Sequence, residues 1–300
     1  MISRRFYSTV IFLSVVAASA AIFFLAQAAD RESGFALAPH RAFPASSEPL
    51  SQASQVPQVL TDIGEQAATG EMAQSLPVLT YHSIRTVIDP GDSLGYGLSV
   101  SAEEFEKQMK FLNHQGYTTL TPDDLLAVLQ KKEALPQKSI MLTFDDGYED
   151  FYTAAFPILK KYKFKATVFI VTGFLGDGQN RYMTWEEIRE LDQSGIISIA
   201  SHTQSHSDLT KSKDAKKEIE DSKSELENFL GHPIITFVYP YGLHDSAAVL
   251  LVSRAGYALG FTTQEGTTMS RARQFALPRV RIWGGMPWYV FVEKVEMLTP

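Results

Sequence analysis

The stretch SIMLTFDDGYEDF, residues 139–151, joins a short apolar segment to two adjacent carboxylates. Apolar residues recur at every second position from Ile140 to Phe144, which predicts a buried strand. The strand runs directly into Asp145 and Asp146, although neighbouring like charges repel and burial removes their solvation. Asp-Asp-Gly alone is more often a turn than a catalytic site. The interpretation therefore depends on what the rest of the chain brings to this strand end.

Short apolar segments of the same kind recur along the chain and alternate with amphipathic segments. The expected strands are Val78–His82, Ser139–Asp145, Ala166–Val171, Ile196–Ser201, Ile234–Val238, Ala258–Thr262 and Arg279–Ile282. Capping boxes at Ser101 and Thr184, and an N-cap at Thr121, mark the starts of helices between them. This alternation predicts an α/β fold, a single distorted (β/α) barrel of about seven parallel strands. Catalytic residues of such barrels gather at the C-terminal ends of the strands.

The composition excludes several classes of protein. The chain has 300 residues, is 45% hydrophobic and carries a net charge of -7. That is enough apolar material for a substantial core, and without a basic excess nucleic acid is not an expected partner. The absence of cysteine from the sequence excludes disulfides, thiolate metal sites and cysteine nucleophiles.

Residues 1–29 are typical of a signal peptide or a membrane anchor. Arg4 and Arg5 precede an apolar run over residues 10–26, and Ala26-Gln-Ala28 suits a signal peptidase. The run is somewhat shorter than the ~20 apolar residues that span a bilayer, and both cleavage and an uncleaved anchor remain open. Either outcome predicts export to the periplasm or the cell surface, with membrane contact only through an uncleaved segment.

The rest of the chain divides into a linker and one folded domain. Residues 30–75 are rich in Ala, Ser, Pro, Gln and Glu and have no sustained periodicity, which predicts a flexible linker. The alternation of strands and helices begins at Leu76, so residues 76–300 are assigned to the folded domain.

A second polar cluster, HTQSH at residues 202–206, follows the expected strand Ile196–Ser201. Its histidines are four positions apart, which in a helical turn places both imidazoles on one face. Imidazole is a common ligand of zinc and related metals, although two surface histidines are the default for such a pair alone. Two histidines and one carboxylate from the neighbouring strand end make three ligands, which leaves a position open for water, as catalytic zinc sites require.

Two further strand ends carry residues of interest. His82 ends the first strand, and by itself it is most simply a structural histidine. Tyr239-Pro-Tyr-Gly242 ends another strand, where Pro240 and Gly242 define a turn that can direct a backbone N–H.

With these four clusters, the chain resembles the polysaccharide deacetylases of carbohydrate esterase family 4, which share the NodB homology domain. The resemblance extends from about Leu76 to Ile282; TFDDG at 143–147 is similar to the first family motif, and residues 202–206 fit its H-[ST]-x-x-H motif. It implies a general base at Asp145. It implies three ligands of a divalent metal ion: Asp146, His202 and His206. Zinc is the expected ion, with cobalt, nickel and iron as alternatives.

Two departures from the family pattern decide the remaining assignments. The arginine-rich third motif is replaced by Phe237-Val-Tyr-Pro-Tyr241, and the late segment Leu277–Ile282 has no histidine to serve as general acid. Pro77–His82 resembles a subgroup, the poly-β-1,6-N-acetylglucosamine deacetylases of biofilm systems, in which that histidine comes near the start of the domain. His82 is therefore the expected acid. Arg279 is expected to orient the base, with a structural salt bridge as an open alternative.

The resemblance thus implies a metal-dependent hydrolase that removes acetyl groups from N-acetylglucosamine units of an exported polysaccharide. The backbone N–H of Tyr241 would stabilise the oxyanion of this reaction. Peptidoglycan, chitin-like polymers and xylan are alternative substrates for the same fold. Two alternatives of other classes are a non-catalytic polysaccharide-binding module and a non-haem iron oxygenase, which also uses two histidines and one carboxylate.

Overall fold

The computed structural model describes residues 73–87, 89, 91–176 and 181–296. The expected signal or anchor, and the expected linker up to residue 72, lie outside these ranges. Gln74 and Ser75, at the end of that linker, form strand β1, which pairs antiparallel with β9 (Thr268–Met269). In the described ranges, no helix combines the length and the apolar character needed to cross a bilayer.

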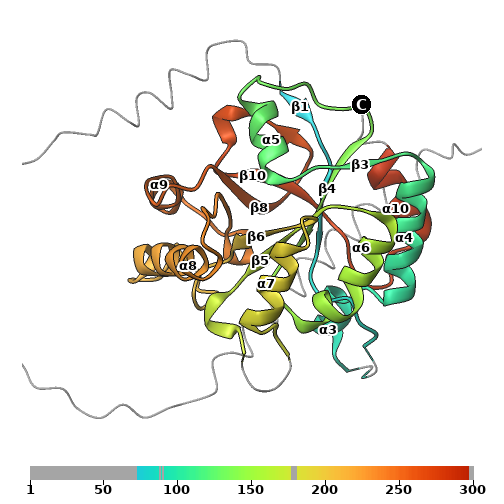
Figure 1. Cartoon of the computed structure of the whole chain (residues 1–300), viewed down its shortest axis with the longest axis horizontal. Helices are drawn as coiled ribbons and strands as arrows, with labels where there is room; N and C mark the ends of the chain where they lie inside the picture. Colours follow the sequence, from blue (N-terminus) through green and yellow to red (C-terminus); the bar gives the residue numbers. More distant parts are fainter. Residues whose placement is uncertain (1–72, 88, 90, 177–180, 297–300) are drawn as a thin grey trace, which may run out of the picture. The chain divides into compact units, whose positions relative to one another are not determined.

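Seven parallel strands form a closed ring (Figure 1). They are β2 (Val78–Tyr81), β4 (Ser139–Phe144), β5 (Ala166–Ile170), β6 (Ile197–Ser201), β7 (Thr236–Val238), β8 (Leu259–Glu265) and β10 (Leu277–Arg281). Their order is β2-β10-β8-β7-β6-β5-β4, and β4 pairs with β2 to close the ring. The two-residue strand β3 (Thr118–Thr119) pairs with the start of β4. The expected barrel and its seven strands are confirmed.

Helices surround most of the ring of strands (Figure 1). They are α3 (Ser93–Leu98), α4 (Ala102–His114), α5 (Pro122–Leu129), α6 (Phe156–Tyr162), α7 (Trp185–Gln193), α8 (Ala215–Leu230), α9 (Ser246–Arg254) and α10 (Trp288–Glu296). Shorter helical turns are η2 (Phe151–Ala155), η3 (Thr172–Phe174), η4 (Pro240–Gly242) and η5 (Arg271–Arg273). The capping boxes expected at Ser101 and Thr184 are present. Thr121 caps α5 as expected, and Asp124 completes a further capping box there.

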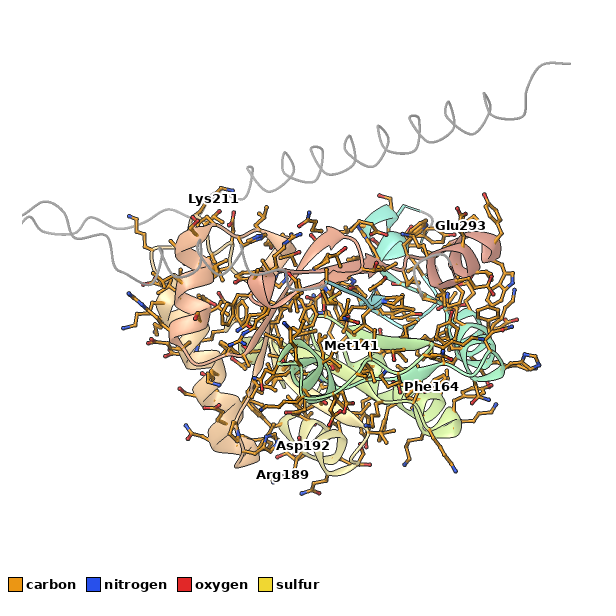
Figure 2. The ribbon with its side chains drawn as sticks, turned by 90° about the horizontal axis from the view of Figure 1, so that it is seen from above. Met141, Phe164, Arg189, Asp192, Lys211 and Glu293 are labelled. Carbon is orange, nitrogen blue, oxygen red and sulfur yellow. The ribbon has the colours of Figure 1, made fainter. Side chains whose placement is uncertain are left out.

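The strands are buried on both faces, as in other parallel sheets covered by helices. Met141 of β4 belongs to the cluster inside the ring, and Figure 2 shows it near the middle of the domain, whereas Glu293 of α10 lies at the rim. Leu125 and Leu129 of α5 share this inner cluster, so α5 contributes to the core of the barrel. Residues at alternate positions, such as Leu142, belong to the outer cluster that the surrounding helices cover.

Strand register brings polar side chains together at the C-terminal end of the ring. The last residues of β2 and β4 pair with each other, so the residues that follow them, His82 and Asp145, are neighbours. The last residue of β6 pairs with β7, which places His202 beside the end of that strand. The site is therefore assembled by sheet pairing between segments that are distant in the sequence.

Candidate active site

Three side chains at this end of the ring converge on one point. The Oδ1 atom of Asp146 lies 3.4 Å from Nε2 of His202 and 3.4 Å from Nε2 of His206. The two Nε2 atoms are 3.1 Å apart. In a tetrahedral zinc site with bonds of ~2.0–2.1 Å, neighbouring ligand atoms are separated by about 3.3 Å. The spacing therefore fits one divalent ion, and among the described residues this is the only group of its kind.

His202 is held in the orientation that a metal ligand needs. Its Nδ1 atom lies 2.9 Å from the backbone carbonyl oxygen of Val238. A carbonyl oxygen can only accept a hydrogen bond, so Nδ1 carries the hydrogen and donates it. The lone pair of Nε2 is then free to face Asp146 and His206. His202 is also 2% exposed, so its ring cannot turn away into solvent.

The backbone around these three residues takes left-handed conformations. The φ angles are 75° at Asp146, 68° at Thr203 and 58° at His206. Such angles in residues other than glycine cost roughly 1–3 kcal/mol each and are found where the surroundings impose them. The segment from His202 to His206 is thus a loop, and the helical turn expected from the four-residue spacing is wrong. The two imidazoles converge because the loop folds back on itself.

Asp145 lies inside the ring in a two-point ion pair with Arg279. Nη1 of Arg279 is 2.8 Å from Oδ1 and Nη2 is 2.7 Å from Oδ2 of the carboxylate. Nε donates to the carbonyl oxygen of Thr262 at 2.9 Å. Burial alone would raise the pKa of Asp145, but the charge and hydrogen bonds of Arg279 outweigh it and leave that pKa below its ordinary value. Asp145 is therefore a carboxylate at neutral pH.

His82 approaches the same carboxylate from β2. Its Nε2 atom is 3.9 Å from Oδ2 of Asp145, and its side chain is 18% exposed. Burial lowers the pKa of His82, while the charges of Asp146 and Asp145 oppose that shift. His82 and Asp145 are thus close enough to act on protons of one substrate group.

The turn η4 places Tyr241 beside the histidines. Its φ angle is 59°, and its ring meets the ring of His206 edge-on at 4.6 Å between centroids. Gly242 follows with φ of 71°, and a Cβ atom there would lie 2.0 Å from Oγ1 of Thr263. Only glycine fits this position, so the turn is fixed next to the site. The expected role of the Tyr241 backbone N–H stays a prediction.

Comparisons with known proteins point to the same chemistry. The model of a family described as polysaccharide deacetylase matches residues 132–260. YxkH of Bacillus subtilis, a protein named for polysaccharide deacetylation, is 34% identical over 253 residues, which cover 84% of this chain and 86% of that protein. The chain belongs to the polysaccharide deacetylase family. The expectation of a deacetylating hydrolase is thereby confirmed.

Other deacetylases are similar over much of the barrel. The poly-β-1,6-N-acetyl-D-glucosamine N-deacetylase of Staphylococcus aureus is 30% identical over 197 residues, 61% of this chain and 68% of that protein. The structure of the Streptococcus pyogenes deacetylase PplD, in complex with acetate, has a TM-score of 0.69 at 32% identity and covers 76% of this chain and 100% of that chain. IcaB from Ammonifex degensii has a TM-score of 0.64 at 24% identity, covers 77% of this chain and 98% of that chain, and shares the fold.

Three residues of this deacetylase site were not singled out from the sequence: Tyr148, Asp150 and Glu218. The Tyr148 ring stacks on Tyr182 at 5.2 Å, and burial, together with the charge of the neighbouring Asp146, raises its pKa. Asp150 accepts hydrogen bonds from the hydroxyl of Ser83 and, at 2.8 Å, from the N–H of Ile84, and so holds the segment after His82.

Of these three residues, Glu218 could have been recognised from the sequence as a buried, partnered side chain. Glu218 falls on the buried stripe of α8, between Ala215 and Ser222, where an acidic side chain requires partners.

Proposed function

We propose that this deacetylase is a metal-dependent hydrolase that removes N-acetyl groups from N-acetylglucosamine units of an exported or cell-surface polysaccharide. The observation that carries the proposal is the convergence of Asp146, His202 and His206 next to the ionised carboxylate of Asp145. Asp146, His202 and His206 would hold the ion. Asp145 would be free to accept a proton.

The ion would be divalent, with zinc favoured by two imidazoles and one carboxylate, and cobalt, nickel and iron as alternatives. When bound, it supplies Lewis-acid chemistry that polarises the acetamide carbonyl and makes the attacking water more acidic.

Asp145 would be the general base that takes a proton from this water. Its pKa lies below its ordinary value, so it is ionised when water must be deprotonated. The two-point contact with Arg279 keeps both carboxylate oxygens in one orientation. Arg279 would therefore be a positioning residue. The variant Arg279→Lys separates this role from a purely structural salt bridge, because it keeps the charge but loses the two-point contact.

His82 would give the second proton, to the sugar amine as the carbon–nitrogen bond breaks. Its Nε2 atom lies 3.9 Å from Oδ2 of the base, so the two residues would reach neighbouring atoms of one substrate group. Because its pKa is lowered, its protonated form is a stronger acid than ordinary histidine. The backbone N–H of Tyr241 would donate to the oxyanion, an interaction that strengthens as charge develops. The products are acetate and a free amine, and no covalent enzyme intermediate is required.

The choice of polymer is supported by two observations. The S. aureus relative, 30% identical, is named for deacetylation of poly-β-1,6-N-acetyl-D-glucosamine. His82 directly follows β2 and precedes the other site residues in the chain, which matches the order expected for that subgroup. The apolar segment at residues 1–29 supports an exported location and, if uncleaved, contact with a membrane.

An acetate-release assay on a panel of polymers tests the proposal. The panel comprises poly-β-1,6-N-acetylglucosamine, chitin oligomers, peptidoglycan and acetyl-xylan, each with metal-stripped and zinc-reloaded enzyme. We expect release from the β-1,6 polymer that stops on metal removal and returns with zinc. Release from another polymer alone would correct the substrate, and release from none would favour a binding module. Turnover that required O₂ would favour an oxygenase.

A further inference from the structure

Glu218 of α8 lies beneath the loop that carries the two histidines. Its Oε2 atom accepts hydrogen bonds from the backbone N–H groups of Gln204, at 3.1 Å, and Ser205, at 2.8 Å. Its Oε1 atom accepts from the hydroxyls of Ser205, at 2.5 Å, and Ser207, at 3.3 Å. The residue is 9% exposed, so these four donors replace most of the water that a carboxylate normally binds.

The loop needs such support because its own backbone preferences oppose its shape. Thr203 and His206 both have positive φ angles, which are unfavourable for residues with a Cβ atom. The N–H of His206 donates to Oγ1 of Thr203 at 3.0 Å, but this bond lies within the loop and cannot fix it to the barrel.

The peptide units in the middle of the loop are held from two sides. On one side, the carbonyl oxygens of Thr203 and Gln204 accept from the N–H groups of Thr172, at 3.2 Å, and Gly173, at 2.8 Å. A Cβ atom at position 173 would lie 2.5 Å from the Gln204 oxygen, so this approach requires glycine. On the other side, the N–H groups bond to Glu218. The carbonyl side is held by the backbone, whereas the N–H side depends on one side chain.

We propose that Glu218 is a positioning residue of the metal site. It fixes the peptide units of Gln204 and Ser205, and through them the direction in which Nε2 of His206 points. All four hydrogen bonds of its carboxylate go to the loop, so it acts through His206 rather than on substrate. The proposal rests on His206 being a metal ligand, as in the proposed function.

Glu225 offers a matched control on the same helix. Its Oε1 atom accepts from the side-chain Nε2 of Gln204 at 2.9 Å. It therefore reaches the same loop, but through a flexible side chain and not through the backbone. Losing this contact should leave the φ angles of the loop unchanged.

The test is a Co²⁺ titration of the metal-free, full-length protein, followed by the visible absorption of the bound ion. Glu218→Met keeps the side-chain length but removes both carboxylate oxygens, and we expect Co²⁺ affinity to fall by about 10–100-fold, as for other residues that orient metal ligands. Glu218→Gln should stay within about threefold of wild type, because its amide oxygen can accept from both N–H groups while its NH₂ donates to the hydroxyls. Glu225→Met should bind Co²⁺ like wild type.

The outcomes separate the two proposals. If wild type showed no Co²⁺ absorption, the metal site itself would be wrong. If wild type and Glu218→Met bound Co²⁺ equally, only the positioning role would fall. If Glu218→Gln lost as much Co²⁺ affinity as Glu218→Met, the effect would come from the charge of Glu218 and not from its hydrogen bonds. That result would also overturn the positioning role. Thermal unfolding of each metal-free variant identifies a general loss of fold. In that event Glu218→Asp, which keeps the charge but is too short to reach both N–H groups, must bind Co²⁺ more weakly than wild type for the proposal to stand.

Discussion

Arg279 and Asp145 meet inside the barrel although 134 positions separate them in the chain. Arg279 lies on strand β10, and Asp145 directly follows strand β4. Both strands pair with β2, so closure of the ring brings the two side chains together. They are 1% and 3% exposed, and each is the other's main compensating charge. Removing either partner would leave a buried charge unpaired, which typically costs 3–5 kcal/mol.

Replacing Arg279 therefore gives the first prediction. Arg279→Met should lower the free energy of unfolding of the metal-free protein by about 3–5 kcal/mol, measured by denaturant titration. The double variant Arg279→Met, Asp145→Asn should recover much of that loss, because neither charge remains. Arg279→Lys keeps the charge but loses the two-point contact. A lower kcat at nearly unchanged stability would support the orienting role, and unchanged kcat would leave only a structural salt bridge.

Asp145→Asn should retain its metal and lose nearly all turnover. The amide has almost the same shape as the carboxylate but cannot accept a proton at neutral pH. Loss of a general base typically costs ~10²–10⁴-fold in rate. Acetate release and metal content, measured on the same preparation, check this expectation. Retention of more than about a tenth of wild-type turnover would require another base.

Substitution of any one metal ligand should remove both metal and activity. The variants are Asp146→Ala, His202→Ala and His206→Ala. A site with three protein ligands holds its ion poorly with two. Metal content by elemental analysis is the measurement, with His114→Ala, an exposed histidine on α4, as the control. Ligand variants that kept wild-type metal content would refute the assignment.

His82→Ala should affect substrates according to their leaving group. An amine must be protonated as it departs, whereas the alkoxide or phenolate of an activated acetyl ester leaves readily. The variant should keep its metal, lose most turnover on the polysaccharide and lose much less on the ester. Wild type should show a bell-shaped pH–rate profile whose alkaline limb is lost or displaced in the variant. Equal losses on both substrates would make His82 a structural histidine.

The pair formed by His232 and Asp192 predicts a pH dependence of stability away from the site. Nε2 of His232 lies 2.9 Å from Oδ1 of Asp192. Partial burial opposes the shift, but hydrogen bonds to Pro233 and Asp192 raise the pKa of His232 above its ordinary value. The raised pKa means that the stabilisation is complete below the unfolded-state pKa of ~6.5 and is lost as pH rises through the folded-state value.

The size of this effect should be small because the histidine side chain is 43% exposed. For such a solvent-screened pair we expect less than about 1 kcal/mol. The measurement is the unfolding free energy of wild type and His232→Gln between about pH 5 and pH 9. The difference between them should shrink as pH rises, and a difference that grew with pH would contradict the assignment.

The elements that could be predicted from the sequence are those with a local signal. Most of the seven strands of the ring show runs of apolar residues or alternating ones, and the capping boxes at Ser101 and Thr184 are complete within four residues. Strands β1, β3 and β9 have two residues each, too few to show a period. Their pairing depends on the neighbouring strand, which local sequence does not reveal.

The gathering of the candidate site residues could be predicted from the sequence, whereas the contacts that support them could not. The four-residue spacing of His202 and His206 predicted that their imidazoles lie together, and they do, but the loop reaches that geometry through left-handed residues and not through a helical turn. Those angles persist because of contacts from η3 and from Glu218 of α8, which belong to other elements of the fold. A residue on an amphipathic helix carries no local sign of the loop that it will hold.

The pairing of β2 with β10, which helps to close the ring, limits when the domain can fold during its synthesis. Strand β2 is the first strand of the ring to leave the ribosome, and its partner β10 is the last, with Leu79 pairing with Val280. The ring cannot close on a nascent chain, since almost the whole domain must be synthesised before these edges can meet. Long-range pairing of this kind also slows folding. In the exported location that we propose, a machinery that threads unfolded polypeptides would receive this chain before the ring has closed.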